Sequence, residues 1–163
     1  IQKYTFPSNL NSPHHAPMRP LILPLLLTSS AHATPLQDIQ QAQTHITAYL
    51  PHLTSQSIAQ ALKDAANKGL RLTIIAPQHT HHQNDSYLLS LLLASKQTPP
   101  APIHYYQETI QAPPFLIIDA RTLWLGPGTQ GPGSASPGNP KQLASAFTLT
   151  GKISQTSKPE SHP

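Results

Sequence analysis

The chain has 163 residues, of which only 10% are charged and none is cysteine, and its formal net charge is +4. This length predicts one domain of ordinary size. The lack of cysteine excludes disulfides, thiol catalysis and zinc–thiolate sites. The 10 Lys and Arg residues are scattered along the chain, so the charge gives no strong signal for nucleic-acid binding.

The N-terminal region has the features of an export signal. Met18 opens a short cationic start, which is followed by the apolar run Leu21–Leu27 and the small-x-small site Ala31–Ala33. The apolar run is too short to span a bilayer. We therefore expect a signal peptide over 18–33, export to the periplasm or beyond, and no transmembrane segment in the mature chain. Residues 1–17 show no periodicity and are predicted to lie upstream of the true start.

The next part of the chain reads as a helix followed by a β-α-β unit. Helical spacing of apolar residues predicts a short helix over 36–42, and alternation predicts a strand over 45–50. A second helix is expected over 58–65, where Gly69 closes it, before a strand over 70–76. Such a crossover predicts parallel strands.

The second half continues the same alternation and then departs from it. A polar loop over 78–84 leads to a helix over 87–95, and strands are expected over 103–106, 115–118 and 122–125. The order α-β-α-β-α-β-β-β is typical of an α/β sandwich. We expect a mixed, mostly parallel sheet flanked by helices.

The C-terminal region has a different composition. Residues 126–140 are rich in Gly, Pro and Ser and are predicted to form a low-complexity loop. Residues 146–150 are expected to form one last strand, and residues 151–163 a disordered tail. The single folded domain is thus expected over 34–150.

The segment Phe115–Gly126 carries the clearest motif. It reads as a buried strand, an acidic turn at Asp119 and a second strand ending in glycine. It resembles the phospholipase D superfamily, in which H-x-K-x-x-x-x-D is followed by a second strand and a G-[ST] turn. Asp119 falls at the motif aspartate, while Ala112 stands at the histidine position and Pro114 at the lysine position. Pro127 stands where the G-[ST] turn has its hydroxyl.

The resemblance covers roughly residues 36–126 and implies a phospholipase D-like sandwich. In that family two copies of the motif meet, from two halves of a chain or from two subunits, and hydrolyse a phosphodiester. One histidine attacks phosphorus and the other protonates the leaving oxygen, while the lysines stabilise charge and the aspartates orient the histidines. Imidazole suits the first role near neutral pH, and fixed cations suit the third.

Only Asp119 of the three motif residues remains, so the resemblance implies the fold but argues against the chemistry. Asp119 itself is interpreted as bonding the backbone of its own turn. We expect an exported domain with a degenerate active site, without a cofactor, that binds a phosphorylated ligand or a protein partner. Two alternatives stay open: an active phosphodiesterase of nuclease or phospholipase type acting as a homodimer, and a decayed gene product without a selected function.

Other candidate residues lie outside the motif. His79, His81 and His82 follow a predicted strand, where ligands gather in open α/β sheets, and their spacing allows them to share a metal ion. The histidine-rich composition of the whole chain favours a polar surface loop instead. His104 is interpreted as an edge-strand residue and Arg121 as an exposed turn residue.

Overall fold

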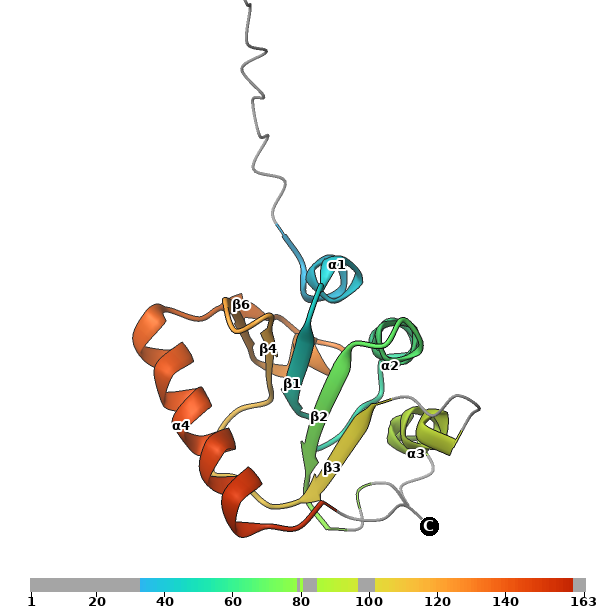
Figure 1. The fold of residues 1–163 in the computed structure, drawn as a ribbon. Helices are drawn as coiled ribbons and strands as arrows, with labels where there is room; N and C mark the ends of the chain where they lie inside the picture. Colours follow the sequence, from blue (N-terminus) through green and yellow to red (C-terminus); the bar gives the residue numbers. More distant parts are fainter. Residues whose placement is uncertain (1–32, 79, 81–84, 97–101, 160–163) are drawn as a thin grey trace, which may run out of the picture. The chain divides into compact units, whose positions relative to one another are not determined.

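The fold is built on a mixed β-sheet with helices on both faces (Figure 1). The computed structural model describes residues 33–78, 80, 85–96 and 102–159. Within these residues the sheet has six strands in the order β3-β2-β1-β4-β5-β6. The elements, in chain order, are α1 (Pro35–Gln41), β1 (His45–Tyr49), α2 (Gln56–Asn67), β2 (Arg71–Ala76), α3 (Leu88–Leu92), the 3-10 helix η2 (Leu93–Lys96), β3 (Ile103–Gln107), β4 (Phe115–Ile118), β5 (Thr122–Leu125), the 3-10 helix η3 (Pro127–Thr129), β6 (Ser136–Pro137) and α4 (Pro140–Thr156).

The first two helices begin at side-chain caps. Thr34 accepts a hydrogen bond from the Gln37 backbone N–H, and the Gln37 side chain accepts one from the Thr34 N–H, which forms a capping box. Ser55 caps α2 by accepting from the Ile58 N–H. Gly69 follows α2 with φ of 89°, a left-handed conformation that glycine adopts without strain. Both helices lie where the sequence predicts them.

The predicted parallel pairing is confirmed for the first three strands. β1 pairs with β2 and β2 with β3, both in parallel. The pairings of β1 with β4, β4 with β5 and β5 with β6 are antiparallel. The sheet is therefore mixed as expected, but its parallel part is limited to β1, β2 and β3.

Alternation along the strands divides the buried residues between two faces. Ile46, Leu72 and Leu116 belong to the larger hydrophobic cluster, which they share with residues of α1, α2 and α3. The intervening positions, such as Ile75 and Ile117, belong to a smaller cluster that includes residues of α4. Burial of both faces explains why the strands read as nearly continuous apolar runs.

The C-terminal region differs from the sequence prediction. Residues 140–156 form helix α4, so the predicted strand over 146–150 is wrong, and the predicted tail over 151–163 begins inside a helix. Asn139 and Gln142 form a capping box at its start, and Ala146, Thr150 and Ile153 are its buried residues at helical spacing. Phe147 and Leu149, two apolar residues of the segment predicted as a strand, are partly buried and pack against the smaller hydrophobic cluster.

The Gly- and Pro-rich segment before α4 forms defined turns. Thr129 is fully buried, and its hydroxyl donates to the Gly126 carbonyl at 2.8 Å. The Gln130 carbonyl accepts from the backbone N–H groups of Thr54 and Ser55, both at 2.9 Å. This segment therefore holds the loop that leads into α2, and its composition reflects close backbone approach.

Candidate functional site

The strand directions define two edges of the sheet. β1, β2 and β3 point the same way, and their carboxyl ends form the edge at which ligands gather in open α/β sheets. Because β4 runs antiparallel to β1, the start of β4 lies at this carboxyl edge. Ala112 and Pro114, just before β4, therefore lie at the edge expected for a binding site, and Asp119, just after β4, lies at the opposite one.

The structure thus does not bring the motif positions together. Pro114 and Asp119 are separated by the whole of β4, which at about 3.4 Å per residue places their Cα atoms about 17 Å apart. The Asp119 backbone N–H donates to the His45 carbonyl at 2.9 Å, at the start of β1. A side chain at position 112 would be oriented by groups other than the Asp119 carboxylate.

Asp119 instead fastens the hairpin to the chain entering β1. Its Oδ1 accepts from the Thr44 N–H at 2.7 Å, the Thr44 hydroxyl at 2.8 Å and the His45 N–H at 3.1 Å, and its Oδ2 accepts from the Gln43 N–H at 2.8 Å. The interpretation that Asp119 bonds its own turn is therefore wrong. Aspartate tolerates the left-handed φ of 51° found here, which allows the hairpin to turn while the carboxylate reaches the neighbouring segment.

The electrostatics of Asp119 follow from these contacts. Burial on its own raises the pKa of this carboxyl group, because it disfavours the charged form. The hydrogen bonds from Thr44, Gln43 and His45 outweigh burial and lower the pKa to about 2. Asp119 is consequently a structural anion at every physiological pH.

The segment before β4 is anchored from the sheet. The Tyr49 hydroxyl donates to the Ile110 carbonyl at 3.1 Å and accepts from the Ile110 N–H at 3.3 Å. The Pro114 carbonyl accepts from the Gly126 N–H at 2.9 Å, which joins the start of β4 to the end of β5. Ala112 and Pro114 are both half-buried.

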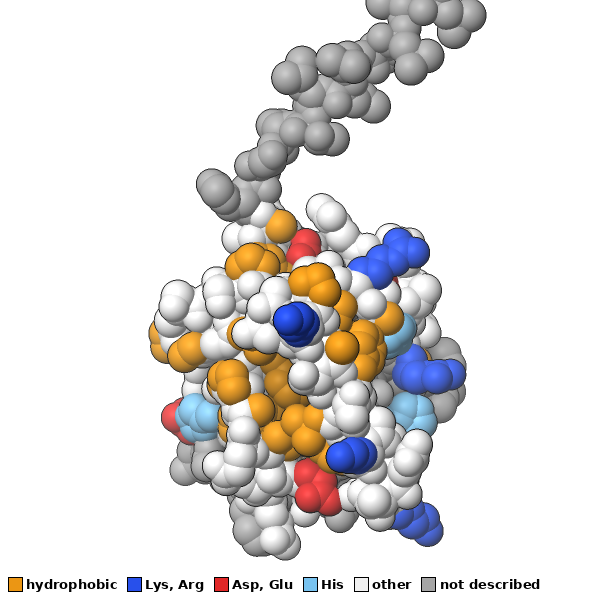
Figure 2. All heavy atoms as spheres, turned by 90° about the vertical axis from the view of Figure 1, so that its left-hand side faces the viewer, with side chains coloured by type: hydrophobic (Ala, Val, Ile, Leu, Met, Phe, Trp, Pro, Cys, Tyr) orange, Lys and Arg blue, Asp and Glu red, His pale blue; other side chains and the backbone are white. Residues whose placement is uncertain are grey.

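A hollow of about 360 Å³ opens beside Ala112, between the sheet and the first turns of α4. Its floor is apolar and consists of Phe115, Leu125, Ala146 and Leu149. Figure 2 looks onto α4 and shows hydrophobic side chains gathered over this face, with single Lys or Arg side chains among them. The remaining lining residues are Pro113 and the polar group Asn139, Lys141, Gln142 and Ser145.

Lys141 is a residue that the sequence reasoning missed. It stands at the second position of α4, in a stretch that composition assigns to a loop or its margin. The signal that could have located it is Asn139-Pro140-Lys141-Gln142, since an asparagine cap, a proline at the first helical position and a glutamine at the third mark a helix start. Lys141 brings a cation to the hollow that Ala112 lines.

The predicted histidine site lies outside the described residues at His79, His81 and His82. The described Thr80 is buried, and its hydroxyl donates to the Pro77 carbonyl at 2.8 Å. Asp85 pairs with His52, whose Nε2 lies 3.1 Å from the Asp85 Oδ2. Within the described ranges no group of three or more His, Cys, Asp or Glu residues is placed to hold a metal ion.

Arg121 and His104 occupy exposed positions away from the hollow. Arg121 lies in the hairpin turn and lines a small depression of about 160 Å³ with Asp38 and Asp119, at the opposite edge of the sheet. His104 lies on the outermost strand, β3, as expected.

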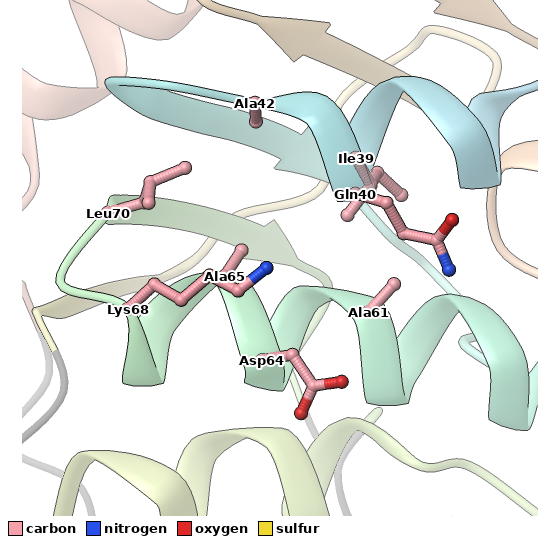
Figure 3. A pocket seen from close by; sticks show the side chains of 8 residues that line it. All are labelled: Ile39, Gln40, Ala42, Ala61, Asp64, Ala65, Lys68 and Leu70. Carbon is pink, nitrogen blue, oxygen red and sulfur yellow. The ribbon is translucent and has the colours of Figure 1, made fainter.

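A second hollow of about 280 Å³ lies between α1 and α2 (Figure 3). Ala42, Ala61 and Ala65 leave the space, and Ile39 and Leu70 form its apolar interior. Figure 3 shows Asp64 directed away from α1; its Oδ1 accepts from the Gln60 side chain at 2.8 Å. This hollow lies near the amino ends of β1 and β2, away from the carboxyl edge.

The part of the chain that the structure describes holds no helix long and apolar enough to cross a bilayer.

Comparison with solved structures confirms the fold. NucT from Helicobacter pylori aligns with a TM-score of 0.57 at 14% identity, over 77% of this chain and 88% of that one. Nuc from Salmonella typhimurium, a phospholipase D family member, aligns with a TM-score of 0.57 at 17% identity over the same shares. The archaeal chromatin protein TrmBL2, described as having a novel mode of DNA binding, aligns with a TM-score of 0.53 at 10% identity, over 77% of this chain and 48% of that one.

Among curated proteins no significant match is found. The model of the family described as "Cardiolipin synthase, PLD-like domain" matches residues 36–127, which is more than half of the chain and runs from the second residue of α1 to beyond the end of β5. The chain therefore belongs to this phospholipase D-like family.

Proposed function

We propose that the protein is an exported phospholipase D-like domain that binds a phosphorylated ligand without hydrolysing it. One observation carries the proposal: Ala112 and Pro114 lie at the carboxyl edge, where the family's reacting residues would lie, and Ala112 lines a hollow that Lys141 also lines. The methyl group of Ala112 offers no nucleophile, and Pro114 has neither a charge nor a backbone N–H. The scaffold of a site is present without the groups that react.

Export is the second part of the proposal and rests on the sequence of residues 18–33. The described fold supports it, because the first helix begins with its own capping box at Thr34, directly after the expected cleavage site. N-terminal sequencing of the protein from its native source should begin at Thr34, and recovery of peptides from residues 1–17 would contradict the Met18 start.

An assay of the purified full chain tests the loss of catalysis. We expect no release of p-nitrophenolate from bis-p-nitrophenyl phosphate and no cleavage of DNA, under conditions in which a control phosphodiesterase is active. Removing a nucleophile lowers rates by many orders of magnitude, so the expected rate is indistinguishable from the buffer. Turnover that copurifies with the chain and disappears in Lys141→Gln would overturn the proposal.

The pair His52–Asp85 favours one alternative, an active phosphodiesterase acting as a homodimer. His52 follows β1 at the carboxyl edge, and a carboxylate beside an imidazole is a common arrangement for orienting a base. His52 is not among the residues that line the hollow of Ala112. Activity lost in His52→Gln but retained in His104→Gln would support an active phosphodiesterase, and a dimeric mass of the active protein would support the homodimer. The absence of turnover in both variants and the parent would exclude this alternative.

A decayed gene product is the remaining alternative. It predicts a chain that is not made or does not bind a ligand, whereas the proposal requires both. Detection of the protein in its native source and saturable binding at the hollow would argue for a selected function.

A further inference from the structure

The rim of the hollow presents hydrogen-bond donors. The Asn139 Oδ1 accepts from the Gln142 N–H at 3.0 Å, and the Gln142 Oε1 accepts from the Asn139 N–H at 2.9 Å. The capping box therefore occupies the carbonyl oxygens of both side chains and leaves their NH₂ groups for other partners. The Ser145 hydroxyl already donates to the Lys141 carbonyl at 3.0 Å. The ammonium group of Lys141 adds three further donors.

The charge of the residues that line the hollow also favours an anionic ligand. Among its described lining residues there is no Asp or Glu, and Lys141 is the single ionic residue. The backbone N–H groups of Gln142 and Leu143 are engaged by Asn139, so recognition falls to side chains rather than to the end of the helix. A rim of donors with one positive charge is complementary to an anion.

The apolar floor of the hollow favours a ligand with an apolar part. Phe115 is buried, while Leu125 and Leu149 are half-buried and pack against the smaller hydrophobic cluster. A small hydrophilic anion would leave this surface in contact with water, whereas an apolar body would cover it at a gain of about 25 cal/mol per Å². A single cation also balances one negative charge better than the two of a phosphate monoester.

We infer that the hollow binds an amphiphilic monoanion, with the anionic group on Asn139, Lys141 and Gln142 and the apolar body on Leu125 and Leu149. This inference rests on the proposed function, because it specifies the ligand of the same site. The residues on the rim belong to α4, beyond the segment 36–127 that the family model matches. In this arrangement the anionic group is held by the C-terminal helix and not by positions 112 and 114 of the motif.

Calorimetric titration of the full chain with hexyl sulfate tests the inference. We expect saturable binding that Lys141→Gln weakens about tenfold, because the substitution removes a charge-assisted hydrogen bond. Lys152→Gln is the matched control, since Lys152 lies exposed on the same helix and does not line the hollow. Neutral hexyl glucoside should bind weakly and equally to all three proteins.

The outcomes separate this inference from the proposed function. If Lys141→Gln and Lys152→Gln weaken the binding of hexyl sulfate equally, the proposed anion site at Lys141 is wrong. If inorganic phosphate binds as tightly as hexyl sulfate, the ligand need not be amphiphilic, and that part of the inference is wrong. The proposed function, binding of a phosphorylated ligand, would still hold. If neither hexyl sulfate nor inorganic phosphate binds, both the inference and the proposed function are wrong.

Vesicles identify the source of the anion. If the anion is a lipid headgroup, the protein should sediment with phosphatidylglycerol vesicles but not with phosphatidylcholine vesicles. Lys141→Gln should then weaken this sedimentation more than Lys152→Gln does. Hexyl sulfate binding without vesicle binding supports a free small molecule. If Lys141→Gln and Lys152→Gln bind vesicles equally and hexyl sulfate does not bind, the hollow is not the binding site.

Discussion

Asp119 shows how a residue can remain at a motif position for a structural reason. Its carboxylate accepts four hydrogen bonds from Gln43, Thr44 and His45, and it joins the β4–β5 hairpin to the chain entering β1. The positions that only the chemistry requires, 112 and 114, lie at the other edge of the sheet. The presence of Asp119 therefore says nothing about catalysis in this chain.

Replacement of Asp119 by asparagine should destabilise the fold without changing ligand binding. Asparagine tolerates the left-handed backbone but loses the negative charge, so we expect a loss of about 1–2 kcal/mol of unfolding free energy. Urea unfolding measures this change. Arg121→Ala in the same turn is the control and should stay within about 0.5 kcal/mol of the parent. Equal stability of Asp119→Asn and the parent would show that the contacts contribute nothing.

The pKa of Asp119 also predicts a pH dependence. The folded value of about 2 lies below the ordinary 3.8, so ionised Asp119 stabilises the fold above pH 3.8, and this contribution disappears as the pH falls towards 2. The stability difference between the parent and Asp119→Asn should be constant near neutral pH and shrink between pH 4 and pH 2. A difference that does not change over this range would contradict the lowered pKa.

At the scale of elements, α4 is the helix that the sequence patterns failed to predict. Gly151 lies in its interior, and a Cβ added there would meet no atom within 4 Å. Gly151→Ala should therefore stabilise the protein by about 0.5–1 kcal/mol, because alanine favours helix and restricts the unfolded chain. Thermal unfolding should show a higher Tm.

Gly126→Ala is the contrasting substitution. Gly126 has φ of 106°, and an added Cβ would lie 2.8 Å from the Ser134 carbonyl oxygen. We expect this variant to unfold at a lower temperature than the parent, since both the backbone conformation and the neighbouring backbone oppose the new methyl group. A higher Tm for Gly126→Ala, or a lower one for Gly151→Ala, would contradict the described backbone.

Local patterns predict the α1–β5 region well for physical reasons. Helix caps at Thr34 and Ser55, the glycine at 69 and runs of buried strand residues are short-range signals, and they agree with the tertiary structure. The turns after β5 depend on contacts across the chain, such as those of Gln130 with Thr54 and Ser55, so Gly and Pro content alone predicts only a low-complexity loop. The hollow beside Ala112 was missed for the same reason, since Lys141 and Ala112 come to line one hollow only through tertiary packing.

At the scale of the whole molecule, two hydrophobic clusters hold the helices on the two faces of the sheet. Leu62 of α2 is fully buried in the larger cluster, and Leu62→Ala should cost about 2–5 kcal/mol in urea unfolding. Leu149→Ala, at the floor of the hollow, should cost less because this side chain is only partly buried, yet it should weaken hexyl sulfate binding. Comparable losses of unfolding free energy in Leu62→Ala and Leu149→Ala would contradict the difference in burial between these two side chains.

The most direct test combines binding and turnover in one sample. Bis-p-nitrophenyl phosphate is a monoanion with apolar groups, and its hydrolysis releases coloured p-nitrophenolate. Titrated into the ¹⁵N-labelled full chain, it should cause saturable NMR shifts near residues 112–115 and 139–146, with no p-nitrophenolate formed over the experiment. Release of p-nitrophenolate by the chain, or shifts confined to the opposite edge around Asp119, would contradict a binding site that has lost its chemistry.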